Sequence, residues 1–444
     1  QQRVQKLRHF SALTAAAMKD NGQTLQLAAQ LPDVLRQAKK EEAIALLSDL
    51  AQSHSERSQW DSAEATYLDL VRRYPEDPAA LAAMRWLLQY WTSAEVAWQR
   101  QKSRGTMVTL QQNDVGALQN RVQQAGGQSP FVAAPRSVKD IIPTSTSGSV
   151  NRGLVNRKGT NPQAPPDALT EWRKRAAGLA QQLEDQSPTL FERPEIQFPL
   201  AALRRARGSA GQADGVYRRF STVSPDESTK LLAERELWLG QGTAEVPRHL
   251  IVCKRAIVRP HLDGVFSDEC WHQSTELTIR DQSREEDDAG PSALVMLAYD
   301  QQFLYVAASC TRLPGAPVTM PVPSDRQHDV ALQDQDRLAI ALDVDRDYAT
   351  WYGFQVDQRG ETHDRCWNND GWDPQWYVAS QADEERWRVE LAIPWDELAP
   401  AAPMPRDAWA ISLMRVIPAH AVHSWTPQSH WPVQWDSFGL VRFE

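Results

Sequence analysis

Hydrophobic residues in the first part of the chain recur at three- and four-residue spacing, which is the period of an amphipathic helix. Four apolar residues share one such helical stripe: Trp60, Ala63, Tyr67 and Leu70. The segment YPEDP at 74–78 interrupts the pattern, and a new helical segment starts directly after it. Residues 1–101 are therefore predicted to form antiparallel helix pairs.

Residues 102–165 lose this periodicity and are rich in Gln, Ser, Thr, Gly and Pro. So few large apolar residues cannot build a core, which predicts a polar linker. The helical pattern resumes in a second helical region, 166–249. There Gly208 separates two amphipathic segments, and Ser224 or Asp226 is placed to cap a third.

From about residue 250 the hydrophobic period changes to two, the period of a β-strand. Tyr352, Phe354 and Val356 alternate with smaller or polar residues. The run RLAIALDV at 337–344 is almost continuously apolar, as a central strand would be. Short alternating strands separated by turn residues predict an all-β antiparallel sandwich over 250–444.

Charge divides the chain at nearly the same place. The net charge is −9, yet residues 253–444 carry 16 Lys and Arg against 31 Asp and Glu, with Lys254 as their single lysine. An acidic surface repels nucleic acid and anionic membranes, so neither is an expected partner. No apolar run of about 18 residues predicts a membrane span. The chain opens with Gln-Gln in place of an initiator Met, which is typical of a processed product.

All four cysteines lie in the acidic half: Cys253, Cys270, Cys310 and Cys366. An even number confined to one domain predicts two disulfides and an oxidising, extracytoplasmic location, whether secreted, periplasmic or at the cell surface. The alternative is four buried free thiols in a reduced protein. Their spacing matches no zinc-binding pattern.

The order of the strand segments is specific, from PHLDGVFSDECW at 260–271 to SFGLVRF at 437–443. It resembles the family 9 carbohydrate-binding modules and their DOMON-like relatives over residues 253–444. The residues that carry the resemblance are Asp263, Gly264, Trp271, Trp395, Trp425, Phe438 and Gly439. The helical part resembles tetratricopeptide repeats. The expected fold is thus tetratricopeptide-like helical repeats followed by a β-sandwich.

The resemblance also implies a site. Sugar-binding members of the family hold a terminal sugar between two tryptophans. Leu332 occupies the approximate place of the first tryptophan, and Ala339 stands where the family often has Glu. Trp431 and Trp435 lie near the place of the second. The departure at Leu332 weakens the expectation of sugar clamping but leaves the expected fold unchanged.

A second candidate for glycan binding is the segment RCWNNDGWDPQWY at 365–377, where tryptophans alternate with Asn, Asp and Gly. Indole faces stack on sugar rings while amides and carboxylates take the hydroxyls. The candidate glycan-binding residues are Trp367, Asn368, Asp370, Trp372, Trp376, Trp431 and Trp435. The alternative is that the 365–377 loop folds back and buries its own tryptophans.

Asp343, Asp345 and Asp347 alternate in DVDRDYATWYG, a spacing that presents oxygens to Ca²⁺. It imitates the start of an EF-hand loop but lacks the glycine and the final glutamate. An ordinary hairpin turn is the alternative. No other cofactor is expected. The chain has none of the common catalytic motifs, and the family is non-catalytic, so no enzyme activity is predicted.

These features favour a non-catalytic carbohydrate-binding module on a helical scaffold, which tethers the protein to polysaccharide or cell-surface glycan. The alternative is a structural or assembly protein of the cell envelope, in which the sandwich and the helical repeats bind protein partners. An accessory or redox domain of an enzyme is a third hypothesis.

Overall fold

The computed structural model describes residues 31–57, 59–103, 168–241, 246–282, 291–313, 315, 328–427 and 430–444. The predicted linker at 102–165 lies almost wholly outside these ranges. The described helices before residue 100 and those from 171 onwards belong to one compact unit with the sheet. None of the described helices has the length and apolar character that a membrane span requires.

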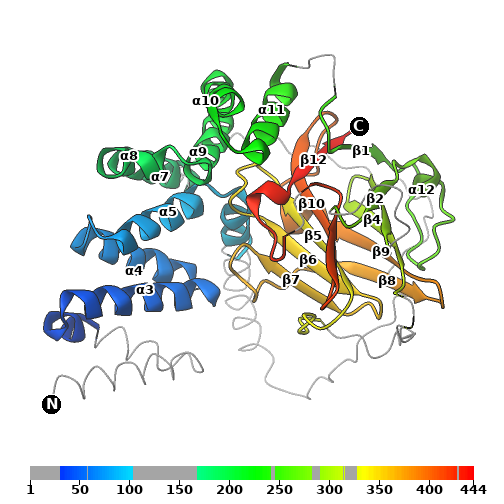
Figure 1. Cartoon of the computed structure of the whole chain (residues 1–444), viewed down its shortest axis with the longest axis horizontal. Helices are drawn as coiled ribbons and strands as arrows, with labels where there is room; N and C mark the ends of the chain where they lie inside the picture. Colours follow the sequence, from blue (N-terminus) through cyan, green and yellow to red (C-terminus); the bar gives the residue numbers. More distant parts are fainter. Residues whose placement is uncertain are drawn as a thin grey trace, which may run out of the picture. The chain divides into compact units, whose positions relative to one another are not determined.

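The first helical region contains α3 (Lys40–Glu56), α4 (Trp60–Arg73), α5 (Pro78–Thr92) and a helix at 94–103. The three labelled helices lie side by side (Figure 1). The break predicted at 74–78 is confirmed. Asp77 begins α5 by accepting a hydrogen bond from the amide of Ala79 at 3.0 Å, and Pro78 fits the first helical position.

The second helical region continues the same arrangement (Figure 1). Its helices are α7 (Ala168–Gln186), α8 (Pro188–Phe191), α9 (Pro194–Ala206), α10 (Ala210–Val223) and α11 (Glu227–Gln241). Gly208 turns the chain between α9 and α10 with φ +75°, a conformation that disfavours other residues. Asp226 caps α11 through the amide of Thr229. The tetratricopeptide resemblance itself remains a prediction.

The strands of the C-terminal region form one curled sheet. They are β1 (Leu250–Arg255), β2 (Leu277–Ile279), β3 (Ala293–Tyr299), β4 (Phe303–Thr311), β5 (Arg337–Asp343), β6 (Tyr352–Asp357), β7 (Thr362–Cys366), β8 (Tyr377–Ala382), β9 (Arg386–Pro394), β10 (Ala408–Ile417), β11 (Ala421–Ser424) and β12 (Gly439–Phe443). Short helices α12 (Glu269–Gln273) and α13 (Trp395–Leu398) interrupt them. The hydrogen-bonded order is β7-β6-β5-β10-β12-β1-β3-β4-β9-β8.

One part of the predicted topology is wrong, because the sheet is mixed. Strand β1 pairs in parallel with both β12 and β3 and so joins two antiparallel halves into a continuous sheet. The sheet curls (Figure 1), and both halves contribute to one buried cluster, for example Ile340 from β5 and Val306 from β4. Pairing between strands far apart in sequence leaves no mark on hydrophobic periodicity, which explains the error.

Glu390 on β9 gives a physical role to the residues that carry the family resemblance. This fully buried carboxylate accepts hydrogen bonds from the amides of Asp263 and Gly264 at 2.9 and 2.7 Å and from Nε1 of Trp271 at 2.8 Å. Gly264 has φ +79°, and a Cβ there would lie 2.8 Å from Cγ of Gln381. These hydrogen bonds therefore hold the segment from Asp263 to Trp271 to the sheet.

The predicted disulfides are wrong: all four cysteines are free and buried. Cys253, Cys310 and Cys366 lie on β1, β4 and β7, and Cys270 lies on α12. Each occupies an apolar cluster as a small hydrophobic side chain would. Burial raises the pKa of every thiol, to about 12 for Cys270 and Cys310. The cysteines thus give no argument for an oxidising compartment.

Candidate functional site

The tryptophans of the 365–377 loop point into the protein. Trp367 and Trp372 are buried. The ring of Trp367 stacks on Trp86 of α5, with ring centroids 5.1 Å apart. Trp372 packs against Tyr352 and Phe354 of β6, at centroid distances of 4.7 and 5.5 Å. Both indole faces therefore hold the loop to the sheet and to the helical region.

Trp376 is buried as well, and its Nε1 donates a hydrogen bond of 3.0 Å to Asp364 on β7. Two polar residues of the loop take outer positions, since Asp370 is exposed and Asn368 is half-buried, whereas Asn369 is buried. This is the self-packed arrangement, because the exposed polar side chains contact water while the rings fill the core. The loop does not present Trp367, Trp372 or Trp376 as a platform for a ligand.

Trp431 has a different environment, since its side chain is 37% exposed. The guanidinium carbon of Arg337 lies 4.9 Å from the centroid of its ring. Arg337 is itself buried and donates to the carbonyl of Leu332 at 2.9 Å and to Oε1 of Gln355 at 2.8 Å. A fixed guanidinium therefore supports an aromatic ring that reaches solvent.

A polar row continues from Arg337 across two more strands. Gln355 on β6 pairs in register with His363 on β7, and Nε2 of Gln355 lies 3.4 Å from Nδ1 of His363. Both side chains are half-buried. Together with Trp431 they combine a partly exposed ring with amide and imidazole groups, which is a composition suited to sugar hydroxyls. We call Trp431, Arg337, Gln355 and His363 the Trp431 site.

Trp431 is the one member of this candidate site that was also a candidate from the sequence. The family resemblance directed attention to Leu332 and Trp431, and the structure brings both to Arg337. Trp435, the other candidate, is half-buried and packs with the cluster around Phe438. Sequence reasoning did not single out Arg337, Gln355 or His363. Their types are ordinary in strands, and only the register of β5, β6 and β7 brings them together.

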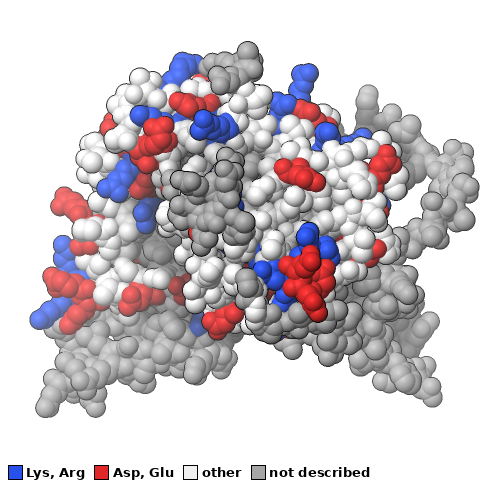
Figure 2. All heavy atoms as spheres, turned by 45° about the vertical axis from the view of Figure 1, so that its right-hand side comes forward, with Lys and Arg blue, Asp and Glu red and all other residues white. Residues whose placement is uncertain are grey.

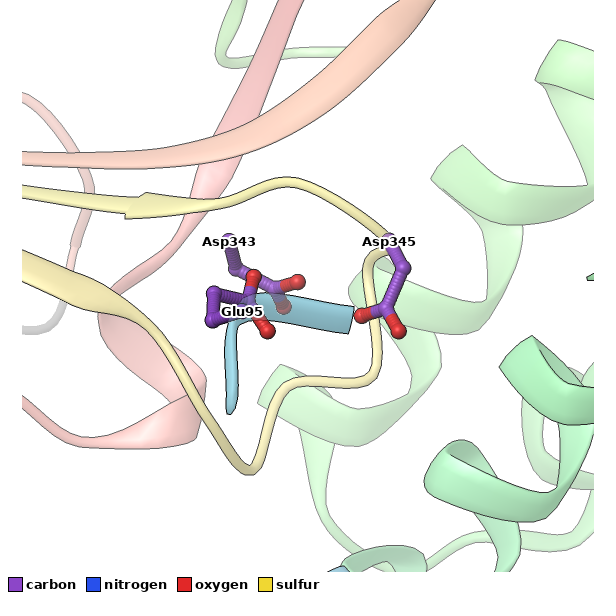
Figure 3. A group of neighbouring side chains, drawn as sticks. All are labelled: Glu95, Asp343 and Asp345. Carbon is purple, nitrogen blue, oxygen red and sulfur yellow. The ribbon is translucent and has the colours of Figure 1, made fainter. Parts of the chain in front are cut away.

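A second group of side chains lies at the end of β5. We call Glu95, Asp343, Asp345 and Asp347 the carboxylate cluster. One oxygen each of Glu95, Asp343 and Asp345 lies within 4.8 Å of the other two (Figure 3). Figure 3 shows Glu95 beside Asp343 and Asp345. Glu95 comes from the start of the helix at 94–103, Asp343 is the last residue of β5, and Asp345 lies in the loop after it. The predicted aspartate spacing thus meets a fourth acid from the helical region, which no local pattern marked.

Backbone amides hold the cluster in place. Asp343 accepts from the amide of Tyr348 at 2.7 Å, and Asp347 accepts from the amides of Ala349 and Thr350 at 2.7 and 2.8 Å. Across the junction, Glu95 accepts from the amide of Val344 at 2.8 Å, and Asp345 from that of Ala94 at 3.1 Å. The helix at 94–103 and the 343–350 loop therefore bind each other through their acids.

Three members of the carboxylate cluster, Glu95, Asp343 and Asp347, are fully buried. Burial raises the pKa of all four carboxyl groups above their ordinary values. For Glu95, Asp343 and Asp347 the neighbouring carboxylates raise the pKa further, because like charges in a poorly solvated site repel each other. Such an arrangement is stable with protons or with a bound cation.

Elsewhere the acidic half is well paired. Arg388 binds Asp383 at 3.0 Å, and Arg359 binds Asp357 at 2.7 Å. On the face shown in Figure 2, acidic and basic side chains lie side by side. The excess of acidic residues therefore does not form a uniform acidic surface on this face.

Comparisons with known proteins match a region that contains Asp263, Gly264, Trp271 and Trp395. Residues 262–421 match the family model described as a carbohydrate family 9 binding domain-like domain. No curated protein matches the chain. Among solved structures, it is similar to a family 9 carbohydrate-binding module from Caldicellulosiruptor kristjanssonii in complex with cellotriose, at 17% identity and TM-score 0.34, covering 44% of this chain and 93% of that one. A structure from the same organism in complex with glucose matches at 16% identity and TM-score 0.34, covering 44% and 95%. The C-terminal region of this chain is thus similar to the family 9 carbohydrate-binding domains.

Proposed function

We propose that this chain is a non-catalytic carbohydrate-binding protein whose ligand contacts the Trp431 site. The family match at 262–421 supports the ligand class. The position of the binding site is supported by the exposure of Trp431. It is the only tryptophan among the exposed large hydrophobic side chains of the described residues. We further propose an extracytoplasmic role in which the module tethers the protein to polysaccharide or cell-surface glycan.

In this proposal the residues of the Trp431 site have different tasks. The ring of Trp431 offers an apolar surface to the C–H face of a pyranose. Arg337 is only 2% exposed, so it supports the ring and does not reach the ligand. Gln355 and His363 are half-buried beside it and supply donors and acceptors for hydroxyl groups. A single exposed ring predicts modest affinity, because the clamp position at Leu332 is a buried aliphatic side chain.

The test uses the full chain and a panel of soluble oligosaccharides and polysaccharides, measured by calorimetry and tryptophan fluorescence. Trp431→Ala should weaken binding of the ligand class by at least about tenfold, the effect of losing one stacking contact. Tyr377→Ala is the matched control, because Tyr377 is an aromatic residue with the same 37% exposure on β8. Equal binding by both variants, or no binding across the panel, would contradict the proposal.

A second function is favoured by the contact between the helical region and the sheet. Trp367 is covered by Trp86, and the clamp position holds Leu332. In this alternative the chain is a structural or assembly protein of the cell envelope whose helical repeats bind protein partners. Co-purification of a defined partner by the full chain, with no response to any glycan, would favour it.

A further inference from the structure

No basic side chain pairs directly with the carboxylate cluster in the described part of the chain. The guanidinium groups of Arg205 and Arg346 oppose part of the rise in the pKa of Asp345, but both are paired with Glu236, at 2.6 and 2.9 Å. Arg205 also donates to the main-chain carbonyls of Asp345 and Arg346. Within the described ranges, no Lys, Arg or His forms an ion pair with any member of the cluster. Four carboxylates thus share one buried site with no cation of their own.

One oxygen in this site receives no N–H or hydroxyl donor. Oδ2 of Asp345 accepts from the amide of Ala94, whereas Oδ1 is buried and accepts from no N–H or hydroxyl group of the described residues. The neighbouring carboxyl group of Asp343 can hydrogen-bond to Asp345 only when one of the two is protonated, so a proton or a cation has to fill this place. Leaving a buried carboxylate oxygen without a partner is costly, so an unfilled acceptor indicates a missing donor or cation. Figure 3 shows the Asp345 carboxylate directed toward those of Asp343 and Glu95.

The spacing of the oxygens fits a particular ion. The three ligand oxygens lie within 4.8 Å of one another. Oxygens that share one Ca²⁺ at about 2.3–2.6 Å lie at most about 5 Å apart. The site offers only oxygen donors, which suit hard cations, and it contains no thiol or imidazole, which zinc and later transition metals prefer.

We propose that Glu95, Asp343 and Asp345 bind a calcium ion that fastens the helix at 94–103 to the loop at 343–350. The ion joins two parts of the chain that lie far apart in sequence. Glu95 lies outside the matched domain at 262–421, so this site requires the helical region. The proposal is independent of sugar binding at the Trp431 site.

The first experiment measures the metal alone on the full chain. The protein is treated with EDTA and dialysed, then titrated with CaCl₂ by calorimetry, with MgCl₂ as a parallel titration. One calcium ion per chain should bind, more tightly than magnesium, and calcium should raise the melting temperature of the EDTA-treated protein. If millimolar calcium gives neither binding heat nor a change in melting temperature, the proposal is overturned and the cluster is held by protons.

Variants then locate the ion. Glu95→Gln and Asp345→Asn preserve side-chain size and should each weaken calcium binding by at least tenfold. Glu390→Gln is the matched control, because Glu390 is an equally buried acid on β9 outside the cluster. It should leave calcium affinity unchanged even where it lowers stability. Unaltered binding in Glu95→Gln would overturn the proposed link to the helix.

A third measurement does not depend on any variant. Limited proteolysis of the wild-type chain compares the calcium-loaded and EDTA-treated forms. Calcium should slow cleavage both near 94–103 and within 343–350, because one ion holds both segments. Protection of only one segment would contradict the bridging role.

Discussion

Buried indole N–H groups need acceptors, and in this protein several of those acceptors are carboxylates. Trp376 donates to Asp364, and Trp271 donates to Glu390. The acidic and tryptophan-rich composition of the C-terminal half thus has partly an internal cause. Burial raises the pKa of an acid that accepts such a hydrogen bond, as it does for Asp364.

Asp364 predicts a pH dependence of stability. Burial raises its pKa to about 7, against the opposing hydrogen bond from Trp376. Because the folded-state pKa lies above the unfolded one, this group's favourable contribution is complete below about pH 4 and is lost as pH rises through about 7. Asp364→Asn should therefore raise the melting temperature at about pH 8 and change it little or lower it at about pH 4. Calorimetry at both values checks this, and an equal shift at both would contradict it.

The cysteines predict a reactivity pattern. All four thiols are buried and have raised pKa values, so they should resist thiol reagents in the native protein. Titration with a chromogenic disulfide reagent should show little reaction in buffer and four thiols per chain in denaturant. Fewer than four in denaturant without reductant would show that disulfides exist after all.

At the scale of elements, the helices and the sheet are joined by specific contacts. Trp86 on α5 stacks on Trp367, and Gln99 in the helix at 94–103 donates to the Tyr352 hydroxyl at 3.1 Å and the Glu397 carbonyl at 2.7 Å. On the other side, Arg235 of α11 donates to the carbonyl of Phe438 at 2.8 Å. Helices from both regions therefore bind the same sheet.

The Trp86 contact can be tested by substitution. Trp86→Ala removes a buried ring from the junction and should lower the free energy of unfolding by roughly 3–5 kcal/mol. Leu68→Ala on α4 is a control, because Leu68 is 36% exposed and should cost less than about 1 kcal/mol. Urea denaturation of both variants provides the comparison. A Trp86→Ala cost no larger than the Leu68→Ala cost would show that the stack contributes little.

For the molecule as a whole, the helical regions supply side-chain contacts that stabilise the sheet. The partner of Trp367 and one member of the carboxylate cluster both come from residues before 100. A fragment covering 250–444 should therefore unfold at a lower temperature than the full chain and show a red-shifted tryptophan emission. Differential scanning calorimetry and fluorescence test this, and a fragment as stable as the full chain would show that the sheet is self-sufficient.

Local sequence patterns were sufficient to predict several helices, turns and strands. Periodicity located the helix break at 74–78, the turn at Gly208 and the strands at 337–343 and 352–357, because these features depend on neighbouring residues. The family resemblance located the Asp263-Gly264 motif. It also indicated Trp431, whose ring is exposed because its loop leaves it outside the core.

Features that depend on residues distant in sequence became visible only in the folded chain. It placed β1 parallel between two antiparallel halves, buried the tryptophans of the 365–377 loop and kept the cysteines apart. It also brought Glu95 to Asp343 and Asp345. Local patterns report which face of an element is apolar. They do not report which other element covers that face, and that pairing created both candidate sites.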